Sequence, residues 1–206
     1  MSAKDQTIDA FPSDLASSLP SPGGGGAAAL CGALAAGLAS MVGALSIGKK
    51  QCAAHEEELS ELSARAAKAR QELLALIDAD AEAFAPLSRA YSLPKDAPDR
   101  AQILEQCLRQ AASAPQKIAG ACCGVIELAE DFAAFGSRLV LSDAATAAAL
   151  ARGALKGAVI NVKVNTALMR DREYADALSA ELEEKERAYS ARADAVCDAV
   201  AASLGF

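Results

Sequence analysis

An aspartate occupies one position of an otherwise apolar helical stripe. The stripe runs through Leu73, Ile77, Asp80, Phe84 and Leu87, whose spacing of four, three, four and three residues places them on one helix face. Burial raises the pKa of a carboxyl group that has no Lys or Arg partner, and a carboxyl poised in this way suits general acid-base catalysis. A buried salt bridge that only fixes the helix register is the structural alternative. We interpret Asp80 as a candidate catalytic proton carrier.

A glycine-rich segment runs directly into a long apolar stretch of the chain. In this segment, Ser21–Gly26 (SPGGGG), the glycines permit positive φ angles and close approach of a ligand to the backbone. The N–H groups at the start of the following helix would favour an anionic group there. A flexible turn that only starts the helix is the alternative. We expect Pro22, Gly23, Gly24 and Gly25 to contribute to a substrate-binding site.

Two asparagines lie in another apolar helical segment. Asn161 and Asn165 are four residues apart and share a face with Leu150, Ala154 and Leu168. Buried amides require hydrogen-bond partners, which are either the helix backbone and each other or the polar edge of a bound ligand. The second alternative makes both asparagines candidate substrate-binding residues.

Motifs for nucleotides and metals are incomplete in this sequence. The segment Gly43–Lys50 (GALSIGKK) resembles a P-loop, but Lys50 stands where Ser or Thr would hold magnesium, and the segment follows a predicted helix. Gly24 and Gly26 lack the third glycine and the preceding strand of a dinucleotide-binding motif. The 6 cysteines form no C-x-x-C pair and the chain has 1 histidine, so we predict no metal site.

The composition predicts an all-α protein with a single domain over residues 1–206. Hydrophobic residues make up 52% of the chain but aromatic residues only 4%, and alanine is abundant, which favours closely packed helices. The net charge of -7 argues against general binding to nucleic acid. The N-terminus has no apolar signal region, so we expect a cytoplasmic location.

The helix expected from Ala27 to Leu45 is central to the predicted fold. It is about as long as a membrane span, but its strongly hydrophobic residues form one stripe, with Ala and Gly on the other faces. The small residues allow neighbouring helices or a dimer partner to approach closely. We therefore expect a central buried helix and no membrane insertion. The stripe consists of Leu30, Leu34, Leu38, Met41, Val42 and Leu45.

The remaining sequence predicts an up-and-down bundle of about six helices in total. A second helix, from Cys52 to Phe84, is expected to end or kink near Pro86, and a turn covers Ser92–Asp99. Further helices are expected from Asp99 through Leu108, from Pro115 to Gly136, from Ser142 or Asp143 to about Met169, and from about Arg172 to Leu204.

With these features, the sequence resembles the cyclodeaminase/cyclohydrolase family, which includes formiminotetrahydrofolate cyclodeaminase and a methenyltetrahydrofolate cyclohydrolase. The resemblance covers nearly the whole chain. It is carried by SPGGGGAAALCGALAAGLASMV with the trailing GKK, by DAEAFAPLSRAYSLPK and by SDAATAAALARGALKGAVINVKVN. It implies a helical homodimer that binds a tetrahydrofolate derivative near the glycine-rich segment, with Asp80 at the position of a catalytic aspartate.

The resemblance implies chemistry at one bridging carbon of the folate. A cyclodeaminase closes 5-formiminotetrahydrofolate to the 5,10-methenyl compound and releases ammonia, whereas a cyclohydrolase opens that bridge with water to give 10-formyltetrahydrofolate. Both reactions pass through a tetrahedral carbon, so Asp80 could move protons in either. We expect Lys49 or Lys50 to hold a substrate carboxylate, and the scheme requires no cofactor beyond the tetrahydrofolate substrate.

Two enzymatic interpretations and one non-enzymatic interpretation remain open from the sequence. The absence of an attached formiminotransferase domain favours a freestanding cyclohydrolase, or a cyclodeaminase supplied by a separate partner. The third interpretation is a helical interaction module in which the polar core residues only set register and dimer pairing. Binding of folate would separate this module from both enzymes.

Overall fold

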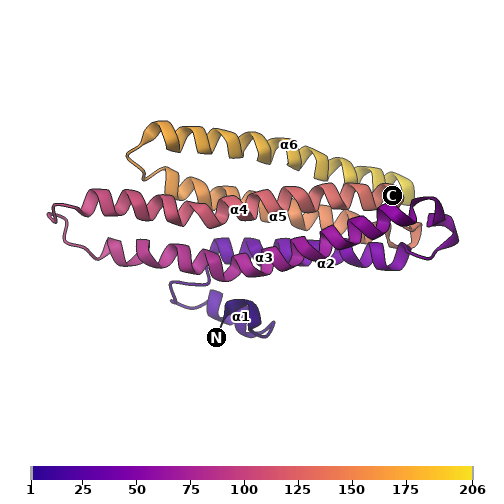
Figure 1. Cartoon of the computed structure of the whole chain (residues 1–206), viewed down its shortest axis with the longest axis horizontal. Helices are drawn as coiled ribbons and strands as arrows, with labels where there is room; N and C mark the ends of the chain where they lie inside the picture. Colours follow the sequence, from indigo (N-terminus) through magenta and orange to yellow (C-terminus); the bar gives the residue numbers. More distant parts are fainter. Residues whose placement is uncertain (1, 206) are drawn as a thin grey trace.

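The structure is a computed structural model that describes residues 2–205, and these residues form helices and connecting turns without strands (Figure 1). The all-α prediction is confirmed. The α-helices are α1 (Ala10–Leu15), α2 (Gly24–Ser46), α3 (Glu56–Tyr91), α4 (Arg100–Phe135), α5 (Leu141–Thr166) and α6 (Arg172–Leu204). Three short 3-10 helices, η1 (Ala3–Asp5), η2 (Lys50–His55) and η3 (Arg138–Val140), lie in the connections.

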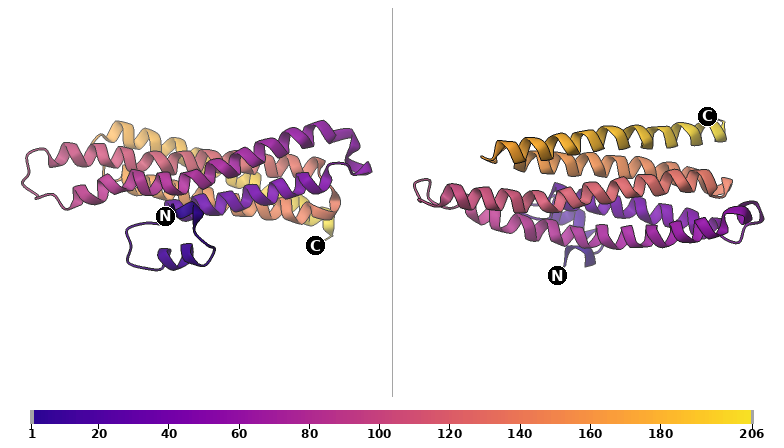
Figure 2. Two further views of the ribbon diagram at one scale, coloured as in Figure 1. Left: turned by 60° about the horizontal axis from the view of Figure 1, so that its bottom comes forward. Right: turned by 45° about the horizontal axis from the view of Figure 1, so that its top comes forward.

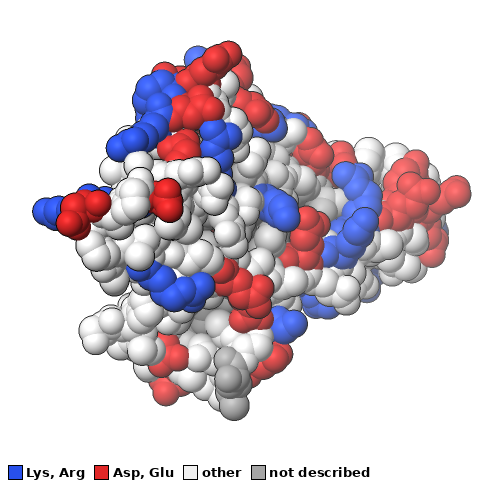
Figure 3. Space-filling model, turned by 60° about the vertical axis from the view of Figure 1, so that its left-hand side comes forward, with Lys and Arg blue, Asp and Glu red and all other residues white. Residues whose placement is uncertain are grey.

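The long helices lie side by side in an up-and-down bundle (Figures 1 and 2). Helices α2, α3, α4 and α5 pack against one another around the core, and α6 covers α5 and α4. The short helix α1 lies outside the bundle, although Phe11 on it is buried. Lys and Arg side chains are interspersed with Asp and Glu on the face shown in Figure 3. Helices α3 and α4 extend past the first residue of α2 (Figure 1). The site described below lies at this end of α2, between the extended helices.

Helix α2 buries its small residues and exposes its large ones. The sequence correctly predicts a central helix, but the leucine stripe does not form its buried face: Leu34 is 58% exposed and Leu45 is 46% exposed. Close approach of α3, α4 and α5 leaves room only for small side chains on the inner face. Apart from Val42, the buried residues of α2 are glycine, alanine or serine: Gly25, Gly26, Ala28, Ala29, Gly32, Ala33, Ala35, Ala36, Ala39, Gly43 and Ser46.

By length and hydropathy alone, α2 also qualifies as a candidate membrane span. Half of its most apolar window is buried inside the bundle, and the core helix of a soluble protein meets the same criteria. The prediction that α2 does not enter a membrane therefore stays a prediction.

Two prolines lie inside helices rather than at their ends. The predicted break between Asp99–Leu108 and a helix starting at Pro115 is wrong, because α4 runs without interruption from Arg100 to Phe135. Helix α3 likewise continues through Pro86 to Tyr91. Proline removes one helical hydrogen bond, but buried neighbours on both sides of Pro115 hold the chain in the core and outweigh that local cost. These neighbours are Ala111, Ala112, Ala114, Ile118 and Ala119.

Gly43 of α2 provides a test of the small-residue packing. A Cβ atom at Gly43 would lie 2.9 Å from Cε1 of Phe132 and would overlap the Ser63 hydroxyl. We expect Gly43→Ala to lower the free energy of unfolding by about 1–3 kcal/mol, the usual cost of overpacking a core. Chemical denaturation measures this change. The matched control is Gly120→Ala in α4, where a Cβ would meet open space and stabilise the helix by up to about 1 kcal/mol.

Candidate functional site

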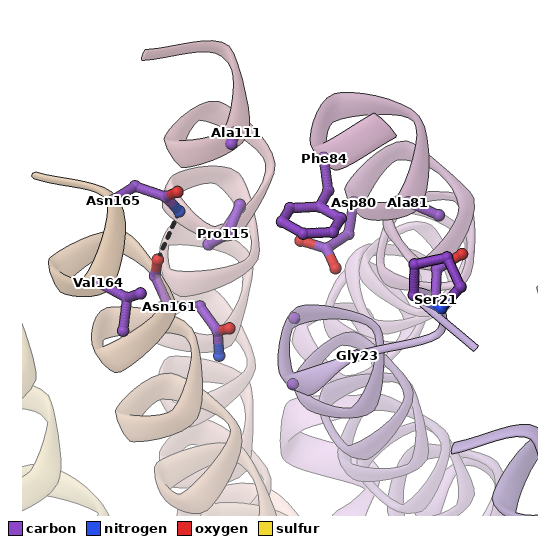
Figure 4. A pocket seen from close by; sticks show the side chains of 13 residues that line it. Ser21, Gly23, Asp80, Ala81, Phe84, Ala111, Pro115, Asn161, Val164 and Asn165 are labelled. Atoms are coloured by element: carbon purple, nitrogen blue, oxygen red, sulfur yellow. Dashed lines mark hydrogen bonds between the residues drawn. The ribbon is translucent and has the colours of Figure 1, made fainter. Parts of the chain in front are cut away.

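A cavity of about 220 Å³ lies where α2 begins against α3, α4 and α5. Figure 4 shows Asp80 and Phe84 of α3 on one side and Asn161 and Asn165 of α5 on the other. The start of α2 forms the floor between them. The cavity therefore joins three groups that the sequence singled out separately. Its lining consists of Pro20, Ser21, Gly23, Gly24, Gly25, Asp80, Ala81, Phe84, Ala111, Pro115, Asn161, Val164 and Asn165.

The Asp80 carboxylate lies directly over the first turn of α2. A Cβ atom at Gly25 would overlap this carboxylate, so the glycine leaves the space that the carboxylate occupies. Burial raises the pKa of Asp80 above the ordinary value of 3.8, and a backbone hydrogen bond from Gly26 partly opposes this shift. Among residues 2–205, Asp80 forms no salt bridge. The structural alternative of a buried ion pair is therefore wrong for the described residues.

The two asparagines combine both alternatives left open by the sequence. Asn161 Nδ2 donates to the carbonyl of Gly157 at 2.8 Å. Asn165 Nδ2 donates to the carbonyl of Asn161 at 2.8 Å, which is the dashed line in Figure 4. Each amide still has an oxygen and a second N–H, and both side chains line the cavity. Gly24 faces Asn161, where a Cβ would lie 2.9 Å from its Nδ2. These amides can therefore exchange hydrogen bonds with a ligand.

The other predicted binding residues divide into two groups. Gly23, Gly24 and Gly25 line the cavity. Pro22 does not line it but packs beside Gly26, and the neighbouring residues Pro20 and Ser21 line the cavity instead. Lys49 and Lys50 are exposed beyond the opposite end of α2, and a helix of 23 residues is about 34 Å long. The structure therefore does not bring the two lysines to this cavity within one chain.

Several lining residues were missed by reasoning from the sequence. Phe84 shares the apolar stripe of Asp80 and could have been found by that spacing, but we expected it to pack inward. Pro115 and Ala111 could not have been found, because the predicted helix break separated them. Val164 is 60% exposed and carries no pattern that distinguishes it from a surface residue.

The N-terminal segment is fastened to α3 near the cavity. Asp78, two residues before Asp80, accepts a hydrogen bond from the backbone N–H of Ala3 at 2.7 Å and another from the Ser2 hydroxyl. Residues 6–23 then return to the start of α2, where Pro20 and Ser21 complete the cavity wall. The wall thus depends on a segment that is anchored to the same helix as Asp80.

The chemical capacity of the site follows from these groups. It offers one desolvated carboxyl group, two amides, the backbone at the start of a helix and the aromatic ring of Phe84. No cluster of three or more His, Cys, Asp or Glu side chains suited to a metal ion occurs among residues 2–205. Such a site can hold a polar, partly aromatic ligand and transfer a proton to or from it.

Comparison with known proteins places the sequence among folate enzymes. The model of the family described as Formiminotransferase-cyclodeaminase matches residues 7–184. The methenyltetrahydrofolate cyclohydrolase of Methylorubrum extorquens is 40% identical over 88% of this chain and 89% of its own length. The formimidoyltransferase-cyclodeaminase of Mus musculus is 34% identical over 81% of this chain, which spans only 32% of that longer protein.

A solved structure is similar throughout. The formiminotetrahydrofolate cyclodeaminase of Thermotoga maritima superposes with a TM-score of 0.84 and 26% identity, covering 96% of this chain and 98% of that one.

Replacement of Asp80 by Asn tests whether its carboxyl is desolvated. Because the pKa of Asp80 is raised, the folded state binds this proton more tightly than the unfolded state does, and the folded protein loses stability as pH rises through the raised pKa. The asparagine in Asp80→Asn cannot ionise. We therefore expect the free energy of unfolding of the variant, relative to that of the parent, to increase from acidic to neutral pH. Denaturation at several pH values measures it.

Glu82→Gln is the control for this comparison, because Glu82 is exposed on the same helix and the variant removes the same formal charge. Parallel stability curves for the parent and Asp80→Asn across the pH range would contradict a desolvated carboxyl.

Proposed function

Since the chain belongs to the formiminotransferase-cyclodeaminase family, we propose that it is a methenyltetrahydrofolate cyclohydrolase, which opens the 5,10-methenyl bridge with water. The observation that carries this choice is the 40% identity with the Methylorubrum extorquens cyclohydrolase over nearly the full length of both chains. The cavity supports it, because hydrolysis of the bridge requires proton transfer and orientation of a heterocycle, for which Asp80 and the two asparagines are suited.

In the proposed reaction, Asp80 acts first as a base and then as an acid. Water adds to the carbon between N5 and N10, and the Asp80 carboxylate takes one of its protons. The bond from this carbon to N5 then breaks, and Asp80 returns the proton to N5. The second proton of the water leaves to solvent as the formyl C=O forms on N10. A raised pKa suits a group that must both accept and donate a proton near neutral pH.

The remaining cavity residues orient the folate. The free amide groups of Asn161 and Asn165 match the alternating donors and acceptors of a pterin edge, and the Phe84 ring offers an apolar surface for its face. The glycines at 23–25 admit the ligand close to the backbone. The proposed reaction requires no cofactor beyond the tetrahydrofolate substrate, whose own bridging carbon is the electrophile.

The second candidate is a cyclodeaminase, which the similarity to the Thermotoga maritima cyclodeaminase favours. In that reaction, N10 attacks the formimino carbon on N5 and the tetrahedral adduct expels ammonia. Asp80 would protonate the departing nitrogen. A non-catalytic helical module is less well supported, because a carboxyl group that only fixes helix register is expected to have an ionic partner, and Asp80 has none among residues 2–205.

We also propose that the protein is a homodimer that uses the outer face of α2. Leu34, Met41 and Leu45 project from this face and are between 38% and 58% exposed. A row of large apolar side chains on a helix is costly to leave in water, and a second copy of the same face would cover it.

Leu34→Glu tests the dimer. A charge within this apolar face should disfavour association, so we expect the variant to sediment as a monomer at concentrations where the parent is dimeric. Leu139→Glu is the control, since Leu139 is 85% exposed on η3, outside α2. Analytical ultracentrifugation reads out both, and a parent that is monomeric throughout would refute the dimer.

A direct assay tests the reaction. With 5,10-methenyltetrahydrofolate, we expect the methenyl absorbance to fall without release of ammonia, whereas a cyclodeaminase would produce both methenyl absorbance and ammonia from 5-formiminotetrahydrofolate. Asp80→Asn should lower kcat by roughly 10²- to 10⁴-fold, the usual contribution of general acid-base catalysis. Glu82→Gln should remain near the parent rate. Turnover of neither compound by the parent would refute the proposed function.

A further inference from the structure

A second pocket adjoins the cavity that contains Asp80. Its volume is about 340 Å³, and it lies between the last turn of α3, the first turns of α4 and the residues that follow α5. Its lining combines three cations with apolar side chains: Tyr91, Lys95, Ala97, Arg100, Ala101, Leu104, Glu105, Leu108, Leu168 and Arg170. We propose that this second pocket binds the glutamate carboxylates of the folate substrate through Lys95, Arg100 and Arg170.

The two pockets follow one another along the same three helices. On α4, Pro115 and Ala111 line the Asp80 cavity, and Leu108 lines the second pocket one turn further on. On α5, the lining passes from Asn165 to Leu168 just beyond the helix. Seven residues of a helix rise about 10 Å, so the distance from Pro115 to Leu108 is a length that one extended ligand can cross.

The cations of the second pocket are available to a ligand. Lys95, Arg100 and Arg170 form no salt bridge with residues 2–205. The only internal hydrogen bond from these three side chains within that range runs from Arg100 Nε to the carbonyl of Leu93, at 3.2 Å, which leaves the two terminal nitrogens of Arg100 free. These nitrogens can bind a carboxylate with the planar geometry that guanidinium groups favour.

The one acidic residue in the lining is already engaged. Glu105 accepts hydrogen bonds from the backbone N–H groups of Arg170 and Asp171, at 2.6 and 3.4 Å, and lies 3.5 Å from Nε of Arg109. It therefore holds the segment after α5 in place and has its charge partly balanced by Arg109. The pocket retains an excess of positive charge from its three cations.

A folate has the charge distribution that this pair of pockets would select. This step rests on the proposed function. One end of a folate is an uncharged pterin, the middle is a p-aminobenzoyl ring, and the other end is a glutamate with two carboxylates. With the reacting carbon beside Asp80, the ring would lie against Leu108 and Leu168, and the carboxylates would reach the cations. Lys49 and Lys50, which were expected to take this role, lie at the other end of α2.

The test compares substrates with and without the glutamate. KM and kcat are measured with 5,10-methenyltetrahydrofolate and with 5,10-methenyltetrahydropteroate, which lacks the glutamate. Lys95→Gln, Arg100→Gln and Arg170→Gln should each raise KM for the folate roughly two- to fivefold, the range expected for exposed ion pairs. Neither kcat nor the KM for the pteroate should change. Added salt should weaken the parent's preference for the folate.

Two controls separate charge from structure. Arg89→Gln removes a positive charge from the same end of α3, but Arg89 lines neither pocket, so its KM should match the parent. Arg100→Lys keeps the charge and loses the Nε bond to Leu93, so its KM should stay close to that of the parent and below that of Arg100→Gln. Variants that raise KM equally for both substrates, or for neither, would overturn the proposal.

Binding measurements distinguish failure of this pocket from failure of the proposed function. Titration calorimetry with tetrahydrofolate and tetrahydropteroate does not require turnover. Tighter binding of tetrahydrofolate that the three Gln variants abolish supports the pocket even if neither methenyl substrate reacts. Equal affinity for the two compounds overturns the pocket even in an active enzyme.

Discussion

The Asp80 carboxylate occupies the space that a side chain at Gly25 would need, and small residues line the buried face of α2 from this contact onward. A Cβ atom at position 25 would overlap the carboxylate, so glycine at this position leaves room for the Asp80 side chain on the first turn of α2. The same closeness continues along α2, whose inner face is almost entirely glycine and alanine. The contact between Asp80 and the start of α2 and the packing of the rest of this helix thus share one requirement, which is small residues on the inner face of α2.

This constraint also explains where the sequence was informative and where it was not. The position of Asp80 on a buried seam, and the pairing of Asn161 with Asn165, follow from helical spacing, which is a local property. That these groups share one cavity does not follow from spacing, because it depends on how far α3 and α4 extend beyond the first residue of α2. The family resemblance linked them before the geometry did.

The errors have physical causes as well. The sequence indicated that the small residues of α2 allow close packing, but it did not indicate that the leucines of α2 would be left largely exposed, which follows because helices that pack this closely select small side chains. The helix break expected at Pro115 assumed that the low helix propensity of proline ends the helix. The helix continues instead because the residues around Pro115 are buried in the core. The short helix α1 has too few residues to show a period. Lys49 and Lys50 lie beyond the opposite end of α2 from the cavity of the same chain, so their contact with a substrate carboxylate stays a prediction.

Pro115 removes one backbone hydrogen-bond donor from α4 at the wall of the Asp80 cavity. A proline has no N–H, so the carbonyl oxygen of Ala111, four residues earlier, lacks its usual helical donor, and both residues line the cavity. That oxygen belongs to the main chain and not to a side chain. Substitutions at position 111 would not remove this carbonyl oxygen, since every amino acid carries the same backbone carbonyl. Only a change at position 115 would supply the N–H that proline lacks and so restore this helical hydrogen bond.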